Sequence, residues 1–360
     1  MVLNLYNGKM LVYIHIPFCD SKCFYCAFNT YVDKFHLKQT YMDALLKQLH
    51  YELEHFSVEK NSIETIFIGG GTPSTIAPQE YKGIFKALKP YLKKDIEITS
   101  EANPNSATKE WLEGMYKLGV NRISFGVQSF NDKKLKTLNR AHNSKTAIQA
   151  IKDASAIGYK NLSLDLIYAV YGDSRELLQK DLQIAFSLPI NHISAYALSI
   201  EEGTHFQSSP KMSQEKLEIT KWLFKEIEQK SFKQYEISNF GTYQSQHNLG
   251  YWRYKNYMGL GCGAVGFLDN QRFYPQTTLE SYIQNPLNID KEKLSDEDIK
   301  MEKIFLGLRS FVGVSEKILS KDEKNRALIL CDEKKLTCKD GIFYNNDYLL
   351  SDELALFISA

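Results

Sequence analysis

Three cysteines near the N-terminus are the residues of this sequence best suited to metal chemistry. Cys19, Cys23 and Cys26 lie within one short span. Three thiolates on one loop can hold three irons of a [4Fe-4S] cluster, which commonly takes four cysteines, so one iron stays open for a small ligand. Two alternatives remain open: zinc, with His15 or His36 as fourth ligand, and a redox dithiol of Cys23 and Cys26. The spacing favours the cluster, because neither histidine has a standard finger spacing and a dithiol leaves Cys19 without a role.

The composition narrows the class of protein. The 360 residues include 44 basic and 43 acidic side chains, and the apolar fraction of 43% suits a globular core. A net charge of +1 gives no electrostatic case for nucleic acid or an anionic membrane. No segment reaches the roughly 18 apolar residues of a membrane span, and the N-terminus lacks the features of a signal peptide. We therefore expect a cytoplasmic protein whose clustered cysteines serve metal or redox chemistry.

The elements that must position the cysteines alternate between strand and helix in the first half of the chain. Strands are expected at Met10–Ile16, Glu64–Ile68, Asp95–Thr99, Arg122–Phe125, Asn161–Ile167 and His192–Ala197. Amphipathic helices are expected from Gln39 onward and at Gln79–Tyr91, Thr108–Leu118, Ser144–Ile157 and Arg175–Phe186. This alternation predicts parallel βα units with right-handed crossovers.

Residues that could bind a metal or a ligand lie at or just past the ends of these strands. In chain order they are Cys19, Gly69–Gly71, Glu101, Gln128, Asp165 and Tyr196. In barrel-like α/β folds the carboxyl ends of the strands build the active site. The pattern therefore predicts an α/β barrel or partial barrel with one shared pocket.

The second half of the chain follows a different pattern. A long helix is expected near Ser213–Gln229, before an aromatic, glycine-rich tract at Tyr235–Phe273. From Met301 two helices precede a hairpin-like tail, as in a small helical or winged module. We expect three parts: a barrel at 1–200, an extension at 201–295 and a C-terminal module at 296–360.

The motifs taken together resemble the radical-SAM superfamily, whose members bind S-adenosylmethionine (SAM). They extend from Tyr13 to about Arg309 and read YIHIPFC, GGGTPS, EANP, RISFGVQSF, LNRAH, the aspartate of LSLDLIY, ISAYALSIEEGT, YEISNF and HNLGYW. Within the superfamily, the chain is similar to the oxygen-independent coproporphyrinogen oxidases and more closely to the HemW-type haem chaperones. The resemblance implies a partial (β/α)6 TIM-like barrel that carries a [4Fe-4S] cluster on the three cysteines, with SAM beside it.

The same resemblance implies the residues that contact SAM. They are Tyr13, Gly70, Gly71, Thr72, Glu101, Gln128, Arg140 and Asp165. Acids can meet the ligand's ammonium or ribose hydroxyls, Arg140 can meet its carboxylate, and glycine permits close backbone approach. Taken singly, the glycines could form a tight turn and the charged residues could be structural; their convergence at strand ends favours the ligand site. Two departures leave local loop shapes open: Asn139 stands where the family often has glycine, and the segment after Ile167 lacks the usual Gly-Leu-Pro turn.

Three features separate the chaperones from the oxidases. Phe28 stands where the oxidases carry a further cysteine, and only nine residues precede the first strand, where the oxidases carry an extension. The segment from His247 to Trp252 matches the HNxxYW signature of the chaperones. The resemblance implies haem binding there, with His247 as candidate axial ligand and with flat faces on Tyr251 and Trp252.

We therefore expect a haem chaperone that delivers haem to a haem-dependent protein and assign no catalytic residue. An electron donor for the cluster is implied, and a homodimer is compatible with the sequence. The first alternative is an oxygen-independent oxidase that decarboxylates coproporphyrinogen III to protoporphyrinogen IX; the second is a non-catalytic, zinc-stabilised barrel. The sequence leaves open whether SAM is cleaved to methionine and a 5′-deoxyadenosyl radical, a chemistry that belongs to the cofactors.

Overall fold

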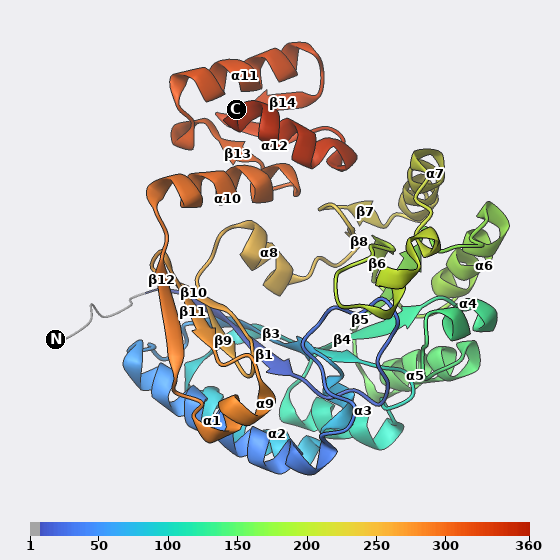
Figure 1. Ribbon diagram of the computed structural model, residues 1–360, viewed down its shortest axis with the longest axis vertical. Coiled ribbons are helices and arrows are strands. Elements are labelled where there is room, and N and C mark those ends of the chain that lie inside the picture. The colour runs from blue at the N-terminus through green and yellow to red at the C-terminus, as the bar shows by residue number, and fades with distance from the viewer. Residues whose placement is uncertain (1–7) are drawn as a thin grey trace.

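A mostly parallel sheet forms the centre of the computed structural model, which describes residues 8–360 (Figure 1). The expectations about a signal peptide and a short N-terminus fall partly on residues 1–7, which lie outside the described residues. Six parallel strands follow one another in sequence order. They are β1 (Met10–Ile16), β2 (Ile63–Gly70), β3 (Leu92–Ala102), β4 (Arg122–Gln128), β5 (Asn161–Tyr168) and β6 (His192–Ala197). This order confirms the predicted α/β class.

Helices between these strands cover the outer face of the sheet (Figure 1). They are α1 (Lys38–His55), α2 (Pro78–Leu88), α3 (Lys109–Leu118), α4 (Asp132–Thr137), α5 (Ser144–Ile157) and α6 (Arg175–Phe186). Local signals set their ends: Asn143 caps α5 by accepting a hydrogen bond from the Thr146 amide, and Gly158 ends it at a φ of 118°. The sheet and all of these helices except α4 share one continuous apolar core.

The chain after β6 extends the sheet at both edges, which the sequence did not predict. The added strands are β7 (Lys233–Gln234), β8 (Asn239–Gly241), β9 (Tyr257–Leu260), β10 (Gly266–Leu268), β11 (Gln271–Pro275) and β12 (Ile289–Lys293). β9 pairs in parallel with β1, and β8 pairs antiparallel with β6. Strands of two to five residues carry too little alternation to be recognised locally. β12 and β7 end the sheet without pairing to each other, so the barrel is open.

Shorter helices accompany this extension. They are α7 (Leu217–Glu228), α8 (Gln246–Trp252) and α9 (Leu279–Gln284). The predicted start of α7 at Ser213 is wrong, because Ser213 instead forms a β-bridge with Val170. α8 lies on the inner side of the sheet, against β2, with α10 beyond it (Figure 1).

The C-terminal segment has a separate apolar core. The segment consists of α10 (Asp296–Leu308), β13 (Val314–Ser315), α11 (Lys321–Asp332), β14 (Leu336–Lys339), β15 (Ile342–Asn345) and α12 (Ser351–Ser359). The expected helices and hairpin are present, whereas α12 was not foreseen. Ile304, Leu308 and Phe343 pack together with residues of α11 and α12. The boundaries at residues 200 and 295 stay a prediction. Within residues 8–360, no helix is long and apolar enough to cross a membrane.

Candidate functional site

A cavity of about 590 Å³ lies at the carboxyl ends of β1–β6. It brings together Cys19, Cys23, Cys26, Gly70, Gly71, Thr72, Glu101, Gln128, Arg140 and Asp165. The cavity thus collects every residue expected to hold the cluster or SAM, except Tyr13. These residues come from five strands or the loops that follow them, as expected for parallel strands whose ends meet at one edge.

Hydrogen bonds fix the cysteine loop on both sides of the cavity. The Cys19 amide donates to the Tyr31 carbonyl at 3.0 Å, which closes the loop onto β1. Across the cavity, the Thr72 hydroxyl donates to Cys19 Sγ at 3.4 Å, and an Arg140 guanidinium N–H donates to Cys23 Sγ at 3.1 Å. Burial raises the pKa of Cys19 to about 11 and raises the pKa of Cys26. A bound metal cation would favour the thiolate forms of Cys19 and Cys26 at neutral pH.

The glycine tract lets two chain segments approach closely. Gly70 has a φ of 108°, and a Cβ there would lie 2.5 Å from the His15 ring. A Cβ on Gly71 would lie 2.8 Å from the carbonyl oxygens of Ile16 and Phe18. Both positions require glycine, because a side chain would collide with β1 or with the cysteine loop.

Two carboxyl groups inside the cavity resist ionisation. Burial, together with the nearby charge of Asp165, raises the pKa of Glu101 to about 8, against a weaker opposing effect of the Gly70 amide, which donates to it at 3.2 Å. Burial likewise raises the pKa of Asp165 to about 6. A cationic ligand that entered the cavity would favour the charged form of both groups.

We expect Glu101→Gln to stabilise the ligand-free protein near pH 8. A folded-state pKa of about 8, above the ordinary 4.5, means that the native state binds the extra proton between these values, so stability falls as pH rises through them. Glutamine removes the free-energy cost of ionising the buried carboxyl group, and its side-chain oxygen can still accept the hydrogen bond from the Gly70 amide. Thermal unfolding should occur a few degrees higher than in the parent at pH 8, with the difference shrinking toward pH 4.5. Equal unfolding temperatures at pH 8 would contradict the assignment.

Two polar atoms in the cavity lack hydrogen-bond partners among the described residues. In the lining of the cavity, Gln128 Oε1 and Arg140 Nε are buried and have no hydrogen-bond partner within residues 8–360. Gln128 also has a φ of 68°, a strained value for a residue other than glycine. Buried polar atoms are normally paired, so these two are suited to a ligand that enters between them.

The two sequence departures fall at left-handed backbone positions. Asn139 has a φ of 57°, and its side-chain amide donates to the Lys22 carbonyl at 2.8 Å. Ala169 has a φ of 63°. Asparagine tolerates this conformation better than most residues, so the loop after α4 keeps the shape for which glycine is otherwise suited.

Tyr13 lies beside the cavity and not in its lining. Its hydroxyl is hydrogen-bonded to His15 Nδ1 at 3.0 Å, and its ring stacks on Phe67. The aromatic residues of the cysteine loop also divide: Phe28 is 67% exposed and lines the cavity, whereas Phe18 packs edge-on against Tyr41 in the core.

His247 lies away from the cysteine cavity, at the opposite end of the sheet. Its Nδ1 is hydrogen-bonded to Thr65 Oγ1 at 2.7 Å and its Nε2 to the Tyr251 hydroxyl at 2.9 Å. The residue is fully buried, and burial lowers the pKa of the imidazole to about 3. Both ring nitrogens are therefore engaged, and the imidazole is neutral.

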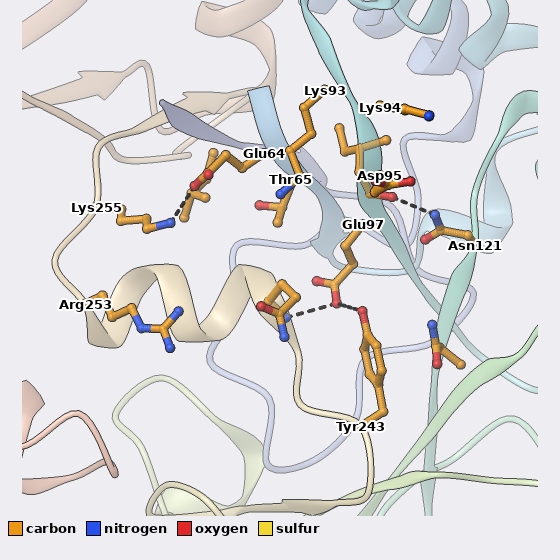
Figure 2. A pocket seen from close by; sticks show the side chains of 14 residues that line it. Glu64, Thr65, Lys93, Lys94, Asp95, Glu97, Asn121, Tyr243, Arg253 and Lys255 are labelled. Carbon is orange, nitrogen blue, oxygen red and sulfur yellow. Dashed lines mark hydrogen bonds and ion pairs between the residues drawn. The ribbon is translucent and has the colours of Figure 1, made fainter. Parts of the chain in front are cut away.

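A basal cavity of about 630 Å³ adjoins α8 at this end (Figure 2). Glu97 accepts hydrogen bonds from the Tyr243 hydroxyl at 2.7 Å and from the first two amides of α8, those of Gln246 and His247, both at 2.9 Å. A carboxylate at a helix N-terminus satisfies amides that lack intrahelical partners. Glu97 thus fixes α8 and its histidine against the sheet.

The chain shares its sequence pattern with proteins of established families. The sequence profile of the Radical SAM superfamily matches residues 13–185. A "Heme chaperone HemW" of Bacillus subtilis is 34% identical over 324 residues, which cover 85% of this chain and 84% of the relative. The Escherichia coli protein of the same name is 38% identical over 71% of this chain and 69% of its own length.

The chain belongs to the HemW family of radical-SAM proteins. Its fold also matches the solved structure of coproporphyrinogen III oxidase (HemN) from Escherichia coli, with a TM-score of 0.82 over 99% of this chain and 91% of the other. The identity to that structure is 18%, so this match shows the fold alone.

Membership of the HemW family and the superfamily implies a [4Fe-4S] cluster and SAM, and the cavity fits both. Cys19, Cys23 and Cys26 line the same cavity, and each thiolate of a cubane binds a different iron. The unpaired atoms of Gln128 and Arg140 and the two buried acids, Glu101 and Asp165, fit a polar, cationic ligand beside the cluster.

The sequence analysis missed two residues, one that lines this cavity and one that acts on its carboxyl groups. Asn103 accepts from the Arg140 guanidinium at 2.6 Å and donates to the Thr72 hydroxyl at 3.0 Å, which links three motifs. Its position in the EANP motif was the sequence signal that could have identified it. Arg122 is 2% exposed, and its charge opposes the raised pKa values of Glu101 and Asp165. An arginine that opens a buried strand was the available signal.

Proposed function

We propose that this protein binds haem and delivers it to haem-dependent proteins, and that it carries a [4Fe-4S] cluster and SAM. The observation that carries the proposal is the 32–38% identity to proteins named heme chaperone, over most of the chain. Phe28 supports it, because an exposed phenyl ring lines the cavity where the resembling oxidases have a cysteine. The partners would be haem, a haem-accepting protein and an electron donor for the cluster; a second copy of the chain is compatible with this role.

Cys19, Cys23 and Cys26 would each hold one iron. SAM would lie between the glycine tract and the strand ends, where Glu101 and Asp165 meet its positive groups and hydroxyls. Arg140 would bind its carboxylate through Nε, which has no hydrogen-bond partner within residues 8–360, while its other two nitrogens donate to Cys23 and Asn103. Bound together, the cluster and SAM supply one-electron chemistry. The chain's own part is to orient SAM, and Gly70 and Gly71 would let the backbone approach it.

The proposed function predicts haem binding without porphyrinogen oxidation. The anaerobically reconstituted protein should bind haem and convert no coproporphyrinogen III, even with SAM and a reductant. Haem titration by absorbance, together with chromatography of the porphyrin products, measures both. An authentic oxidase assayed in parallel provides the positive control. Steady protoporphyrinogen production would replace this proposal with the oxidase, and a parent protein that bound no haem would refute it directly.

A further inference from the structure

Residues far along the chain contact the cysteine loop from outside the cavity. After Cys26 the loop returns toward the core through residues 29–34, which we call the returning arm. Three of its side chains meet residues 277–280, which we call the flanking segment. The pairs are Asn29 with Thr277 at 2.7 Å, Tyr31 with Leu279 at 3.1 Å, and Lys34 with Glu280 at 3.1 Å. The partners follow in the same order along both segments, so the two lie side by side although 248 residues separate the first pair.

Two hydrogen bonds give this contact its geometry. Asn29 Nδ2 donates to the Thr277 carbonyl, and the Leu279 amide donates to the Tyr31 hydroxyl. Each bond therefore joins a side chain of the returning arm to the backbone of the flanking segment. The ion pair is more exposed, with 34% and 57% of its side chains accessible, and exposed ion pairs contribute little to stability.

The flanking segment is itself fixed to the main core. Leu279 is fully buried, and so is Tyr282 within α9, where its ring centroid lies 5.3 Å from that of Tyr41. Thr278 caps α9 by accepting a hydrogen bond from the Ser281 amide at 3.3 Å. The contact therefore ties the returning arm to the apolar core that also contains β1.

The backbone of the returning arm is held from its inner side. The Asn29 carbonyl lies 3.1 Å from His15 Nε2, and a carbonyl can only accept, so Nε2 carries the proton and Nδ1 accepts from the Tyr13 hydroxyl. The Tyr31 amide donates to the Pro17 carbonyl at 2.7 Å. Both residues thus use the backbone toward β1 and the side chain toward the flanking segment. A side-chain substitution removes the outer contact and leaves the inner one.

We propose that Asn29 and Tyr31 are positioning residues for the [4Fe-4S] cluster and that the flanking segment helps to hold it. This inference rests on the proposed function in one respect, that the protein carries the cluster, and it does not depend on haem. The Cys19 amide donates to the Tyr31 carbonyl at 3.0 Å, and Cys26 stands three residues before Asn29. A displaced arm would therefore move two of the three thiolates.

A contact of this kind acts in both directions. If the flanking segment stabilises the form of the loop that holds the cluster, then a bound cluster stabilises the contact by the same free energy. The Leu279 amide reports on the contact directly, because its partner is the Tyr31 hydroxyl. Leu279 lies outside the lining of the cavity, so an effect of the cluster on this amide must pass through the returning arm.

Two conservative substitutions test the positioning role. Asn29→Asp keeps the size of the side chain and removes its donor, and Tyr31→Phe removes a single oxygen atom. Each should speed the chelator-driven loss of iron from the anaerobically reconstituted protein by about threefold to tenfold, as expected for one lost hydrogen bond. Asn346→Asp is the matched control, since the Asn346 side chain also donates to a backbone carbonyl, that of Lys334 at 2.9 Å, in the C-terminal segment. It should lose iron at the parent's rate.

Hydrogen exchange separates positioning from general stability. In the parent, mass spectrometry of the peptide that spans residues 277–284 should show slower exchange in the cluster-loaded protein than in the cluster-free protein. In Tyr31→Phe, cluster loading should leave that exchange unchanged, because the hydroxyl that links the two segments is absent. A variant that was merely less stable would exchange faster in both forms and keep the difference between them, which would overturn the positioning role.

These outcomes separate the inference from the proposed function. A parent that binds the cluster, with Asn29→Asp and Tyr31→Phe losing iron at the parent's rate, overturns the positioning role and leaves the proposed function standing. Equal acceleration in Asn346→Asp, or exchange in the parent's flanking segment that is indifferent to the cluster, overturns it as well. A parent that assembles no cluster overturns both. Circular dichroism of each variant establishes that it is folded.

Discussion

Replacing Cys19, Cys23 or Cys26 by alanine is expected to remove the iron-sulfur chromophore almost completely. Each thiolate would hold a separate iron of the cubane, so the loss of one leaves an open corner that the loop cannot fill. Iron and sulfide, about four of each per chain in the parent, should both fall to a small remainder. Anaerobic reconstitution followed by iron, sulfide and absorbance measurements gives the result.

Two other cysteines supply the control for this prediction. Cys331 and Cys338 lie in the C-terminal segment, on α11 and β14, and neither lines the cysteine cavity. Alanine at either position should leave the cluster intact. A triple variant of the loop cysteines that kept its iron and sulfide would place the cluster elsewhere. Stoichiometric zinc without sulfide in the parent would restore the zinc alternative.

The second large effect is expected on SAM binding. Glu101→Ala and Asp165→Ala should each weaken SAM binding by roughly tenfold to a hundredfold, because a hydrogen bond to a charged group contributes about 1.5–3 kcal/mol. The cluster should persist in both, since neither carboxylate would bind iron. SAM titration of the reconstituted protein, with the iron content measured in parallel, checks both statements.

Glu52→Ala is the matched control for these variants. Glu52 on α1 is a buried glutamate whose pKa burial also raises to about 8, and it lies outside the cysteine cavity. It should lower stability without changing SAM affinity. Loss of SAM binding in Glu52→Ala equal to that in Glu101→Ala would mean that general destabilisation, and not a contact, explains the effect.

The raised pKa values also predict a pH dependence of SAM binding. Burial raises the pKa of Glu101 to about 8 and that of Asp165 to about 6, so near pH 6 both are largely or partly protonated. A ligand cation favours the carboxylates, so binding releases protons and affinity should rise with pH up to about 8. The rise should flatten in Glu101→Ala. A pH-independent affinity in the parent would remove Glu101 from the ligand contacts.

Local sequence signals were sufficient for the six parallel strands and most helices between them. β1 and β6 have the bounds that the sequence predicted, as do α5 and α6. Their apolar periodicity and caps act within a few residues, so the chain specifies them without knowledge of distant partners. The cysteine spacing and the positions of Gly70, Glu101 and Asp165 at strand ends likewise predicted a shared cavity, because parallel strands bring those ends together.

Tertiary structure alone decided what depends on contacts between distant segments. β9 is recognisable as a strand only through its pairing with β10 and with β1, which is nearly 250 residues away in the chain. The sequence suggests His247 as an axial ligand of haem iron. In the structure, however, Thr65 of β2 and Tyr251 of α8 are hydrogen-bonded to its two ring nitrogens. The cavity lined by Tyr251, Phe267 and Phe305 forms only where α8, β10 and α10 meet. Burial and hydrogen-bond saturation are properties of neighbours in space, and no local pattern encodes which neighbours a side chain will have.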